Sequence, residues 1–395
     1  MQAFSFYCPT RILFGRGTEQ QVGEQVRSFG GTKVLIVYGG QSARRSGLLE
    51  RVEESLTGSG LSFVTLGGVQ PNPRLSLVRE GIRLAGESGA DFILGVGGGS
   101  VIDTAKAVAH GAANPELDIW DDIWMKKVPL TKTLPVGAVL TISAAGSELS
   151  DSAVLTDEEH HLKRGLNTDL QRPKFAIMNP ELTFTLPRYQ VACGAVDILM
   201  HTLERYFTPV GGNALTDELA EGIMRTVVRF APAAVADAHD YDAMSELMWA
   251  GALSHNGLTE LGRGKDFSGH QLGHELSARF DVAHGASLSV MWPCWARYCV
   301  DTDPARFARF GEKIWGLAPT DDAREDALRA IGMTEFFFRS LDMPTSFTEL
   351  GIGVQSEAVL EDLATRCTFF GTRSIGRFRT LGHDDILSIY RMANR

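Results

Sequence analysis

The first half of the chain alternates short apolar runs with amphipathic stretches. Two of the apolar runs, Val34–Val37 and Phe92–Leu94, are continuous enough to predict central strands buried on both faces. Alternation of strand and helix patterns predicts a mostly parallel α/β sheet. The expected strands are Arg11–Phe14, Lys33–Tyr38, Leu61–Leu66, Phe92–Val96, Pro135–Leu140 and Phe175–Met178, and the expected helices include Gln20–Phe29, Leu48–Leu56, Leu75–Ala85 and Val101–His110.

After about Pro187 long helical patterns dominate, and strand-like alternation nearly disappears. We place a boundary near Thr185–Arg188, which gives an α/β dinucleotide-binding domain over residues 1–186 and a helical domain over residues 187–395. Two domains also suit a length of 395 residues, which is long for a single core. The expected helices of the second domain include Gln190–Tyr206, Leu215–Ala236, Tyr241–Asn256 and Pro304–Trp315.

Composition and charge narrow the classes of partner. The net charge is −10 and no block of Lys and Arg occurs, so nucleic acids and anionic membrane surfaces are poor partners. No apolar run reaches the roughly 18 residues needed to span a bilayer, and the N-terminus lacks a signal-peptide pattern, so we expect a cytoplasmic protein. Five cysteines without a C-x-x-C spacing favour free thiols over a disulfide framework.

A glycine-rich segment, Gly97-Gly98-Gly99-Ser100, lies between the strand Phe92–Val96 and a helix that begins near Val101. Glycines at such a junction let backbone N–H groups approach a phosphate, and the helix N-terminus adds unpaired donors. The segment is neither the G-x-G-x-x-G fingerprint nor a P-loop. A tight strand-to-helix turn without a ligand therefore remains an alternative.

A second glycine pair, Gly39-Gly40, follows the strand Lys33–Tyr38. Dinucleotide folds that bind NAD commonly place a carboxylate near this point, where it holds the ribose hydroxyls. No acidic residue occurs in the segment from Tyr38 to Arg45. The absence removes repulsion against a 2′-phosphate, and Arg44 or Arg45 can pair with that phosphate unless they only begin a solvated helix.

Two pairs of residues have the spacing of one helix face: Asp197 with His201, and His270 with His274. His284 follows shortly after. One carboxylate with two or three imidazoles suits a divalent ion such as Fe, Zn, Mn or Ni, with a coordination position left for substrate. A lone Asp/His pair is commonly a helix-face hydrogen bond, but three histidines within fifteen residues are harder to explain without a metal.

These motifs together resemble the iron-containing (group III) alcohol dehydrogenases, especially the butanol dehydrogenase-like branch. The resemblance covers nearly the whole chain. It rests on these segments: Pro9–Gly15, Gly67–Pro73, Gly97–Lys106, Gly146–Glu148, Asp197–His201 and Gly262–Leu276. It implies a dehydroquinate synthase-like fold, with a Rossmann-like α/β domain followed by an all-α domain, and a homodimer.

The resemblance also implies roles for individual residues. Asp197, His201, His270 and His284 match the family's metal-binding positions, whereas His274 matches a histidine beside the metal that is usually not a ligand. Fe²⁺ is the first expectation for the metal, with Zn²⁺ or Ni²⁺ as alternatives. The positions expected to bind the cofactor are Gly39, Gly40, Asn72, Gly98, Gly99, Ser100, Asp103, Thr141 and Lys163.

Two positions depart from the family pattern. Ala145 stands where the family usually has Thr before Gly-Ser-Glu, so a hydroxyl near the cofactor is missing and Ser143 is the residue that can compensate. Asn179 stands in place of the usual Asp before Pro180. Branches that use NAD tend to carry Asp at the position of Gly39, which again favours NADP(H) over NAD(H).

The expected reaction is reversible hydride transfer between NADP(H) and a small primary alcohol or aldehyde, with the metal acting as a Lewis acid. His274 is the expected catalytic residue, as a proton relay, although it can equally serve only to pack beside the metal. The alternatives within the same superfold are a glycerol dehydrogenase and a sugar-phosphate cyclase. An alternative of another class is a non-catalytic sensor that binds NADP.

Overall fold

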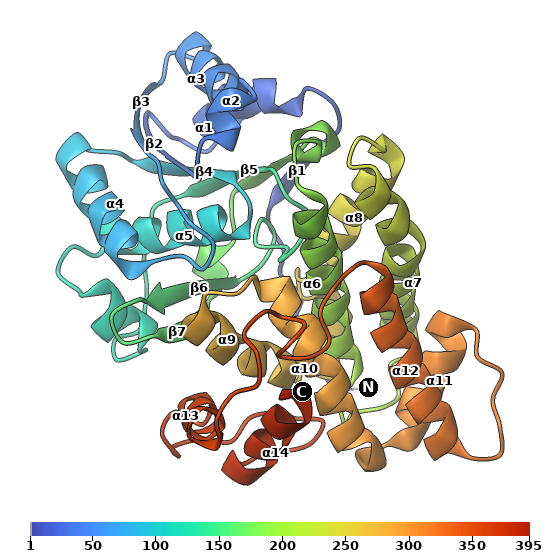
Figure 1. Ribbon diagram of the computed structural model, residues 1–395. Helices are drawn as coiled ribbons and strands as arrows, with labels where there is room; N and C mark the ends of the chain where they lie inside the picture. Colours follow the sequence, from blue (N-terminus) through green and yellow to red (C-terminus); the bar gives the residue numbers. More distant parts are fainter. Residues whose placement is uncertain (1) are drawn as a thin grey trace. The chain divides into compact units, whose positions relative to one another are not determined.

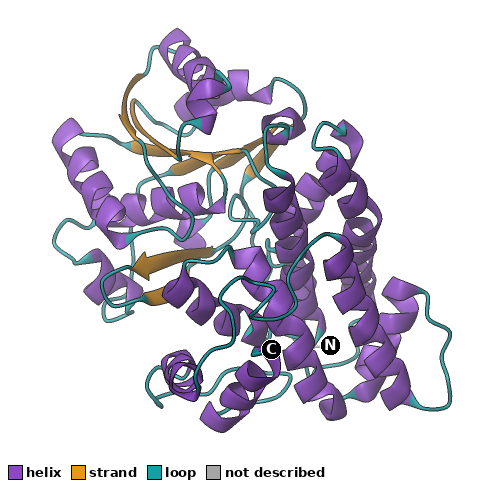
Figure 2. Cartoon of the chain, in the orientation of Figure 1, coloured by secondary structure: helices purple, strands orange, loops and turns teal. Residues whose placement is uncertain are grey.

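The computed structural model describes residues 2–395 and divides into two units. One unit is Tyr7–Leu186, and the other combines residues 2–6 with Pro187–Arg395. The sequence assigns residues 2–6 to the α/β domain, but they group with the helical unit, where the backbone N–H of Gln2 donates to the carbonyl of Gly262 (3.3 Å). Figure 1 shows the course of the chain, and Figure 2 marks its helices and strands.

The first unit is built on a six-stranded sheet of order β1-β8-β5-β4-β2-β3, in which every neighbouring pair is parallel. This agrees with the expected fold class. The elements are β1 (Arg11–Phe14), α1 (Val22–Ser28), β2 (Lys33–Tyr38), α2 (Ser42–Arg45), α3 (Leu48–Gly58), β3 (Ser62–Leu66), α4 (Leu75–Ser88), β4 (Phe92–Gly97), α5 (Gly99–Ala113), β5 (Val136–Leu140), β6 (Ser152–Asp157), β7 (Leu162–Asn167) and β8 (Phe175–Met178).

Helices cover both faces of this sheet because alternate strand residues point to opposite sides. On one face Val34 and Ile36 of β2 pack with α1 and α3, in a cluster that includes Val26 and Val52. On the other face Leu35 and Val37 pack with α4 and α5. The continuous apolar run of β2 therefore reflects burial on both sides, as the sequence predicts.

An antiparallel hairpin of β6 and β7 stands apart from the main sheet. The sequence analysis did not predict it. Its register pairs Thr156 with Lys163, and its apolar residues Ala153, Leu155 and Leu166 join the cluster on the α4–α5 side. The position of Lys163 on β7 therefore depends on the packing of this hairpin, which no local sequence pattern predicts.

In the described part of the second unit, all the regular secondary structure is helical. The α-helices are α6 (Arg188–Tyr206), α7 (Ala214–Ala236), α8 (Tyr241–Ser254), α9 (Ser268–Phe280), α10 (His284–Cys299), α11 (Pro304–Trp315), α12 (Ala323–Ser340), α13 (Glu357–Cys367) and α14 (His383–Ala393). Along residues 2–395, none of the helices has the length and apolarity needed to cross a lipid bilayer.

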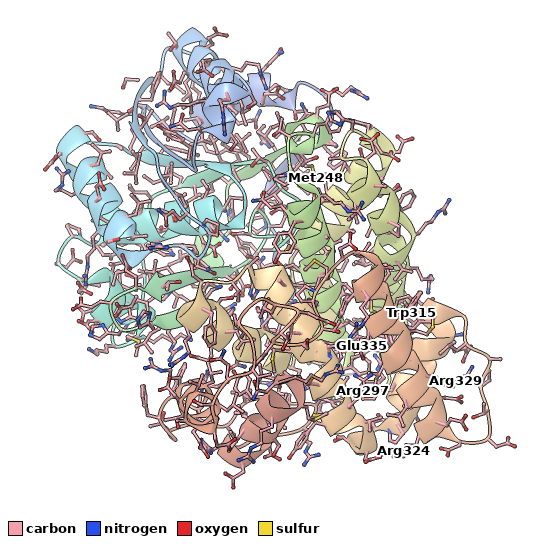
Figure 3. All side chains as sticks on the ribbon, in the orientation of Figure 1. Met248, Arg297, Trp315, Arg324, Arg329 and Glu335 are labelled. Atoms are coloured by element: carbon pink, nitrogen blue, oxygen red, sulfur yellow. The ribbon has the colours of Figure 1, made fainter. Side chains whose placement is uncertain are left out.

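Ion pairs join the helices of this unit around its apolar core. Glu335 of α12 accepts from Arg297 of α10 (2.5 Å), and also from Arg339 and Arg395. Figure 3 labels Glu335 and Arg297. Glu335 is partly buried, and although burial opposes its charge, Arg297 and Arg395 help to hold its pKa below the ordinary value. The network ties α10, which begins at His284, to α12 and to the C-terminal residue.

Candidate metal centre and cofactor-binding loops

Helix α6 carries three ionisable side chains on one face. Asp197, His201 and Glu204 follow at intervals of four and three residues, which place them one above another on a helix. All three are buried, at 4%, 3% and 2% exposure. Burying charged groups is costly unless they are paired or bind a cation. We therefore expect other side chains or a cation to contact this face of α6.

The partners come from α9 and α10. The Nε2 atoms of His201, His270 and His284 lie 3.4, 3.6 and 3.9 Å from Oδ1 of Asp197. The ligand atoms of Asp197, His201 and His270 all lie within 4.8 Å of one another. The structure therefore brings together the four side chains that the sequence analysis expected to bind the metal, although His284 follows Asp197 by 87 positions (284 − 197).

The geometry of this cluster fits a divalent cation. Ligand atoms about 2.1 Å from one ion in a tetrahedral arrangement lie about 3.4 Å apart. Among residues 2–395, Oδ1 of Asp197 and Nε2 of His270 are buried without a hydrogen-bond partner. Buried polar atoms are seldom left so. The donor set itself, one carboxylate oxygen with imidazole nitrogens, suits Fe²⁺, Zn²⁺ or Ni²⁺.

The electrostatics of the cluster also favour a cation. Burial alone would lower the pKa of His270, but Glu204 and Asp197 outweigh it and raise the pKa to about 9. Burial, reinforced by His255 and His270, holds the pKa of His201 well below its ordinary value. The carboxylates thus favour positive charge at His270, and burial keeps His201 neutral. A neutral imidazole is the form that binds a metal.

His274 and His284 lie on the more accessible side of the cluster. The side chain of His284 is 23% exposed, whereas those of His201 and His270 are 4% exposed. The ring centroid of His274 lies 5.2 Å from that of His284 and 6.3 Å from that of His270. His274 therefore neighbours the cluster. The group whose ligand atoms all lie within 4.8 Å of one another includes neither His274 nor His284, but Nε2 of His284 lies 3.9 Å from Oδ1 of Asp197.

Three residues that the sequence analysis did not select touch the ligands. Glu204 accepts from the backbone N–H of His270 (2.9 Å) and contacts its ring Nδ1 (3.0 Å). His255 stacks on His201 with ring centroids 3.9 Å apart, and Phe267 lies 4.9 Å from the ring of His270. Only Glu204 had a local signal, its spacing from Asp197 and His201.

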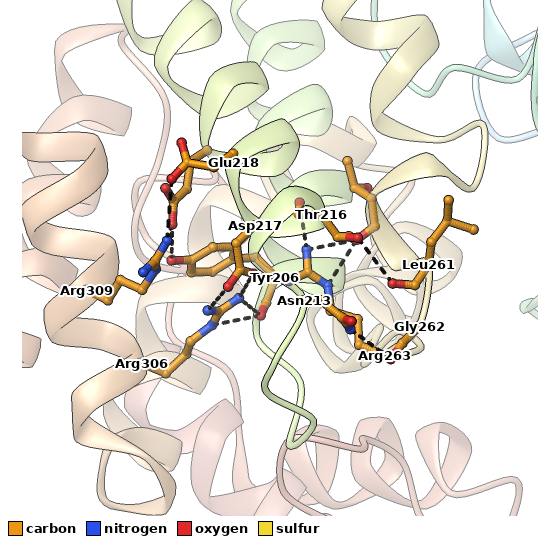
Figure 4. A network of polar contacts seen from close by, with 12 residues as sticks. Tyr206, Asn213, Thr216, Asp217, Glu218, Leu261, Gly262, Arg263, Arg306 and Arg309 are labelled. Atoms are coloured by element: carbon orange, nitrogen blue, oxygen red, sulfur yellow. Dashed lines mark hydrogen bonds and ion pairs between the residues drawn. The ribbon is translucent and has the colours of Figure 1, made fainter. Parts of the chain in front are cut away.

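A polar network anchors the C-terminal end of α6 at Tyr206, two residues after Glu204 (Figure 4). Asp217 of α7 bonds both Arg263 and Arg306, and Arg306 also donates to the carbonyl of Tyr206 (2.9 Å). The hydroxyl of Tyr206 donates to Glu221 (2.8 Å). These contacts fix the helix that supplies two of the potential ligands.

In the α/β unit, most of the predicted cofactor residues follow the carboxyl ends of neighbouring strands. Gly39 and Gly40 follow β2, Asn72 follows β3, Gly98 follows β4, and Thr141 follows β5. In the sheet β2 and β4 are neighbours, and the chain runs from β2 outward to β3 but from β4 the opposite way to β5. Ligands of open α/β sheets bind at such a switch point.

The glycine loop forms the start of α5. Gly98 is the N-cap residue, Gly99 and Ser100 open the helix, and no side chain in the described chain caps it. A Cβ on Gly98 would lie 2.2 Å from Cγ2 of Ile142, so any other residue there would force the side chain of Ile142 to move. The backbone N–H groups at this end and the helix dipole suit a phosphate group.

Other predicted cofactor residues differ in what the structure places beside them. Asp103 accepts from the hydroxyl of Ser147 (2.5 Å) and from the N–H of Val154 (2.8 Å), so its carboxylate supports the local fold. Nζ of Lys163 donates to Oδ1 of Asn72 (2.9 Å). The backbone N–H of Thr141 donates to Gly97 (3.1 Å).

Ser143 provides a fit test for a bound cofactor. Its side chain is buried, at 6% exposure, and its hydroxyl has no hydrogen-bond partner among the residues that the structure describes. Ser143 is the residue that the sequence analysis expected to compensate for the hydroxyl missing at Ala145. An unpartnered buried hydroxyl suits a polar ligand group.

The segment after β2 is less constrained. A Cβ on Gly39 would meet only the carbonyl of Val69 (3.6 Å) and Cγ2 of Val101 (3.7 Å), which are ordinary contacts. Packing therefore does not require glycine at this position. Arg44 lies close by and donates to the hydroxyl of Tyr38 (2.6 Å).

Comparison with known proteins decides the family. Residues 9–180 match the family described as iron-containing alcohol dehydrogenase, and residues 191–394 match the C-terminal domain of the same family. The chain belongs to the iron-containing alcohol dehydrogenases. It is an NAD(P)-dependent oxidoreductase, and the family implies a divalent metal with a nicotinamide cofactor.

Relatives of this iron-containing alcohol dehydrogenase cover nearly its whole length. NADH-dependent butanol dehydrogenase A of Clostridium acetobutylicum is 38% identical, over 99% of both chains. NADPH-dependent aldehyde reductase YqhD of Escherichia coli is 35% identical, over 92% of this chain and 93% of its own. The crystal structure of NADH-dependent butanol dehydrogenase A from Thermotoga maritima is 36% identical, covers 100% of this chain and 99% of its own, and has a TM-score of 0.95.

Proposed function

We propose that this enzyme catalyses the reversible, metal-dependent interconversion of a small primary alcohol and its aldehyde, with NADP(H) as the favoured cofactor. The observation that carries the proposal is the buried oxygen of Asp197 facing three imidazole Nε2 atoms. Asp197, His201, His270 and His284 would hold one divalent ion, with Fe²⁺ as the first expectation. The ion supplies Lewis acidity toward the substrate oxygen, and the nicotinamide supplies or accepts the hydride.

The chain itself binds and positions the cofactor. The N–H groups at the start of α5 would bind the pyrophosphate, with Gly98 allowing close approach. Ser143 would donate or accept a hydrogen bond, since its buried hydroxyl is otherwise unpartnered within the described residues. Lys163, held by Asn72, adds a positive charge toward the cofactor phosphates or ribose.

The preference for NADP(H) rests on the residues after β2. Gly39 brings no carboxylate, although its backbone would accommodate one, and Arg44 provides a cation nearby. A carboxylate there would repel a 2′-phosphate. Relatives named for NADH and for NADPH both match the chain, so the proposal depends on these residues alone.

His274 is the proposed proton relay. Its ring lies beside His284, on the more exposed side of the cluster. An imidazole can release a proton at one ring nitrogen and take one up at the other near neutral pH. His274 would therefore move a proton between the substrate oxygen and solvent.

The test is a steady-state screen of short-chain aldehydes with NADPH and with NADH, on protein reconstituted separately with Fe²⁺, Zn²⁺ and Ni²⁺. The proposal predicts turnover that needs a metal and proceeds faster with NADPH. Cofactor binding without turnover across the panel would support a sensor instead. Equal rates with NADH would overturn the preference drawn from Gly39.

A further inference from the structure

We propose that Glu204 is a positioning residue of the metal centre, which fixes His270 in the ring orientation and tautomer that can bind a cation. The inference rests on the proposed function, because it concerns the same metal. It goes further by assigning a role to Glu204, which is not a member of the group of potential ligands formed by Asp197, His201 and His270.

Glu204 contacts His270 at two points. One carboxylate oxygen, Oε1, accepts from the backbone N–H of His270 at 2.9 Å, and the other, Oε2, lies 3.0 Å from ring Nδ1. An ionised carboxylate can only accept in such a contact, so Nδ1 carries the proton in the neutral form of the ring, the form that binds a metal. The lone pair of His270 is then left on Nε2, the atom that lies 3.6 Å from Asp197.

The surroundings hold Glu204 in this pose. Its side chain is 3% exposed, and its own carbonyl accepts from the backbone N–H of Asp266 at 2.8 Å, just before α9 begins. Gly269 leaves the space that the carboxylate occupies, because a Cβ there would lie 2.4 Å from Oε1. The glycine next to His270 is thus matched to the carboxylate on α6.

His270 differs in this respect from His201. In residues 2–395 the Nδ1 atom of His201 has no hydrogen-bond partner, and its ring is held by stacking on His255. The ring of His270 is held instead by a charge-assisted hydrogen bond. Carboxylate partners of metal-binding histidines orient the ring and increase its basicity, and their loss commonly weakens metal affinity about 10–100-fold.

Metal affinity of the full-length protein, measured without turnover, tests the inference. The protein is stripped with a chelator and titrated with Zn²⁺ against a chromophoric competitor, and the visible spectrum of bound Co²⁺ reports the ligand geometry. Glu204→Gln keeps an oxygen for the backbone N–H but can present an amide N–H to ring Nδ1. We expect the Kd for Zn²⁺ to rise about 10–100-fold and the Co²⁺ spectrum to change.

A second variant approaches the same contact from α9. Gly269→Ala places a methyl group against Oε1 and leaves Glu204 in the sequence, while alanine favours the helix. It should also weaken Zn²⁺ binding, and it decides the test alone if Glu204→Gln does not fold. The matched control is Asp326→Asn in α12, which changes another buried carboxylate that accepts from one backbone N–H, that of Thr320, and from one side chain, that of Arg329.

The outcomes separate this inference from the proposed function. Zn²⁺ affinity of Glu204→Gln or of a folded Gly269→Ala within twofold of the wild type would overturn the role of Glu204 and leave the metal mechanism intact. A wild-type protein that binds no divalent metal would overturn both. Weakened binding in the Asp326→Asn control, equal to that of Glu204→Gln, would show a general effect of losing a buried carboxylate and would also contradict the inference.

Discussion

Lys163 and Asn72 hold each other in the α/β unit, with Nζ of the lysine donating to Oδ1 of the asparagine at 2.9 Å. Both residues are buried, although 91 positions separate them. Asn72 has a left-handed backbone (φ 59°), which asparagine adopts more readily than most residues. Two side chains that the sequence predicts to bind the cofactor thus come together from different elements, the loop after β3 and the strand β7.

Replacing Lys163 by methionine should weaken cofactor binding more than it changes the maximal rate. The variant keeps an apolar stem of similar length but removes the positive charge. We expect the KM for NADPH to rise about tenfold, equal to about 1.4 kcal/mol, with kcat changed less. Initial rates at varied NADPH check this. An unchanged KM would place Lys163 outside the cofactor site.

Ser143→Ala should affect cofactor binding without destabilising the protein. The hydroxyl has no hydrogen bond to lose in the described chain, so the free energy of unfolding should stay the same or increase slightly. With cofactor bound, the lost hydrogen bond should cost about 0.5–1.5 kcal/mol and raise the KM for NADPH several-fold. Thermal unfolding with and without NADPH separates the two effects. A destabilised variant with an unchanged KM would contradict this assignment.

Gly39→Asp should exchange the cofactor preference. The new carboxylate would repel a 2′-phosphate and accept from ribose hydroxyls, so kcat/KM should fall at least roughly tenfold with NADPH and rise with NADH. Gly39→Ala is the control, because its methyl group makes only contacts of 3.6 Å or more. If the aspartate variant keeps the wild-type ratio of the two cofactors, Gly39 does not determine the preference.

The sequence could predict most of the fold because its signals are local. Burial on both faces of β2 appears as the continuous run from Val34 to Val37. The hairpin of β6 and β7 escaped notice because Lys163, Arg164 and Gly165 interrupt any apolar pattern. Its position depends on tertiary contacts, such as the hydrogen bond from the indole of Trp124 to the carbonyl of Arg164 (3.0 Å).

The candidate metal centre could be predicted in part for the same reason. Spacing places Asp197 and His201 on one helix face, and it would have placed Glu204 there too. The contact of Glu204 with His270 spans 66 positions and has no local signal. Spacing could not separate His270 from His274 either. The family resemblance made that distinction, and the structure places Nε2 of His270 near Asp197.

Asp217 should make stability depend on pH in acid. Burial opposes its charge, but Arg306 and Arg263 lower its pKa below the unfolded value of about 3.9. Such a group stabilises the fold above that value and loses its contribution as pH falls through the folded pKa. Asp217→Asn should lower the free energy of unfolding at pH 7 by about 2–4 kcal/mol, since Arg263 loses a buried partner.

Urea unfolding of wild type and Asp217→Asn at several pH values checks this prediction. The difference between the two proteins should be largest at neutral pH and should shrink as pH falls below about 4. A difference that stays constant down to pH 3 would show that the charge of Asp217 is not the cause.

The most direct measurement of the central claim is aldehyde reduction by His270→Ala, with NADPH, after reconstitution beside the wild type in Fe²⁺ or Zn²⁺ and with bound metal determined. If Asp197 and the histidines hold the catalytic ion, the variant should bind metal weakly and lose at least about 100-fold in kcat/KM, which corresponds to about 2.7 kcal/mol. Full activity with NADPH in His270→Ala would contradict the metal mechanism.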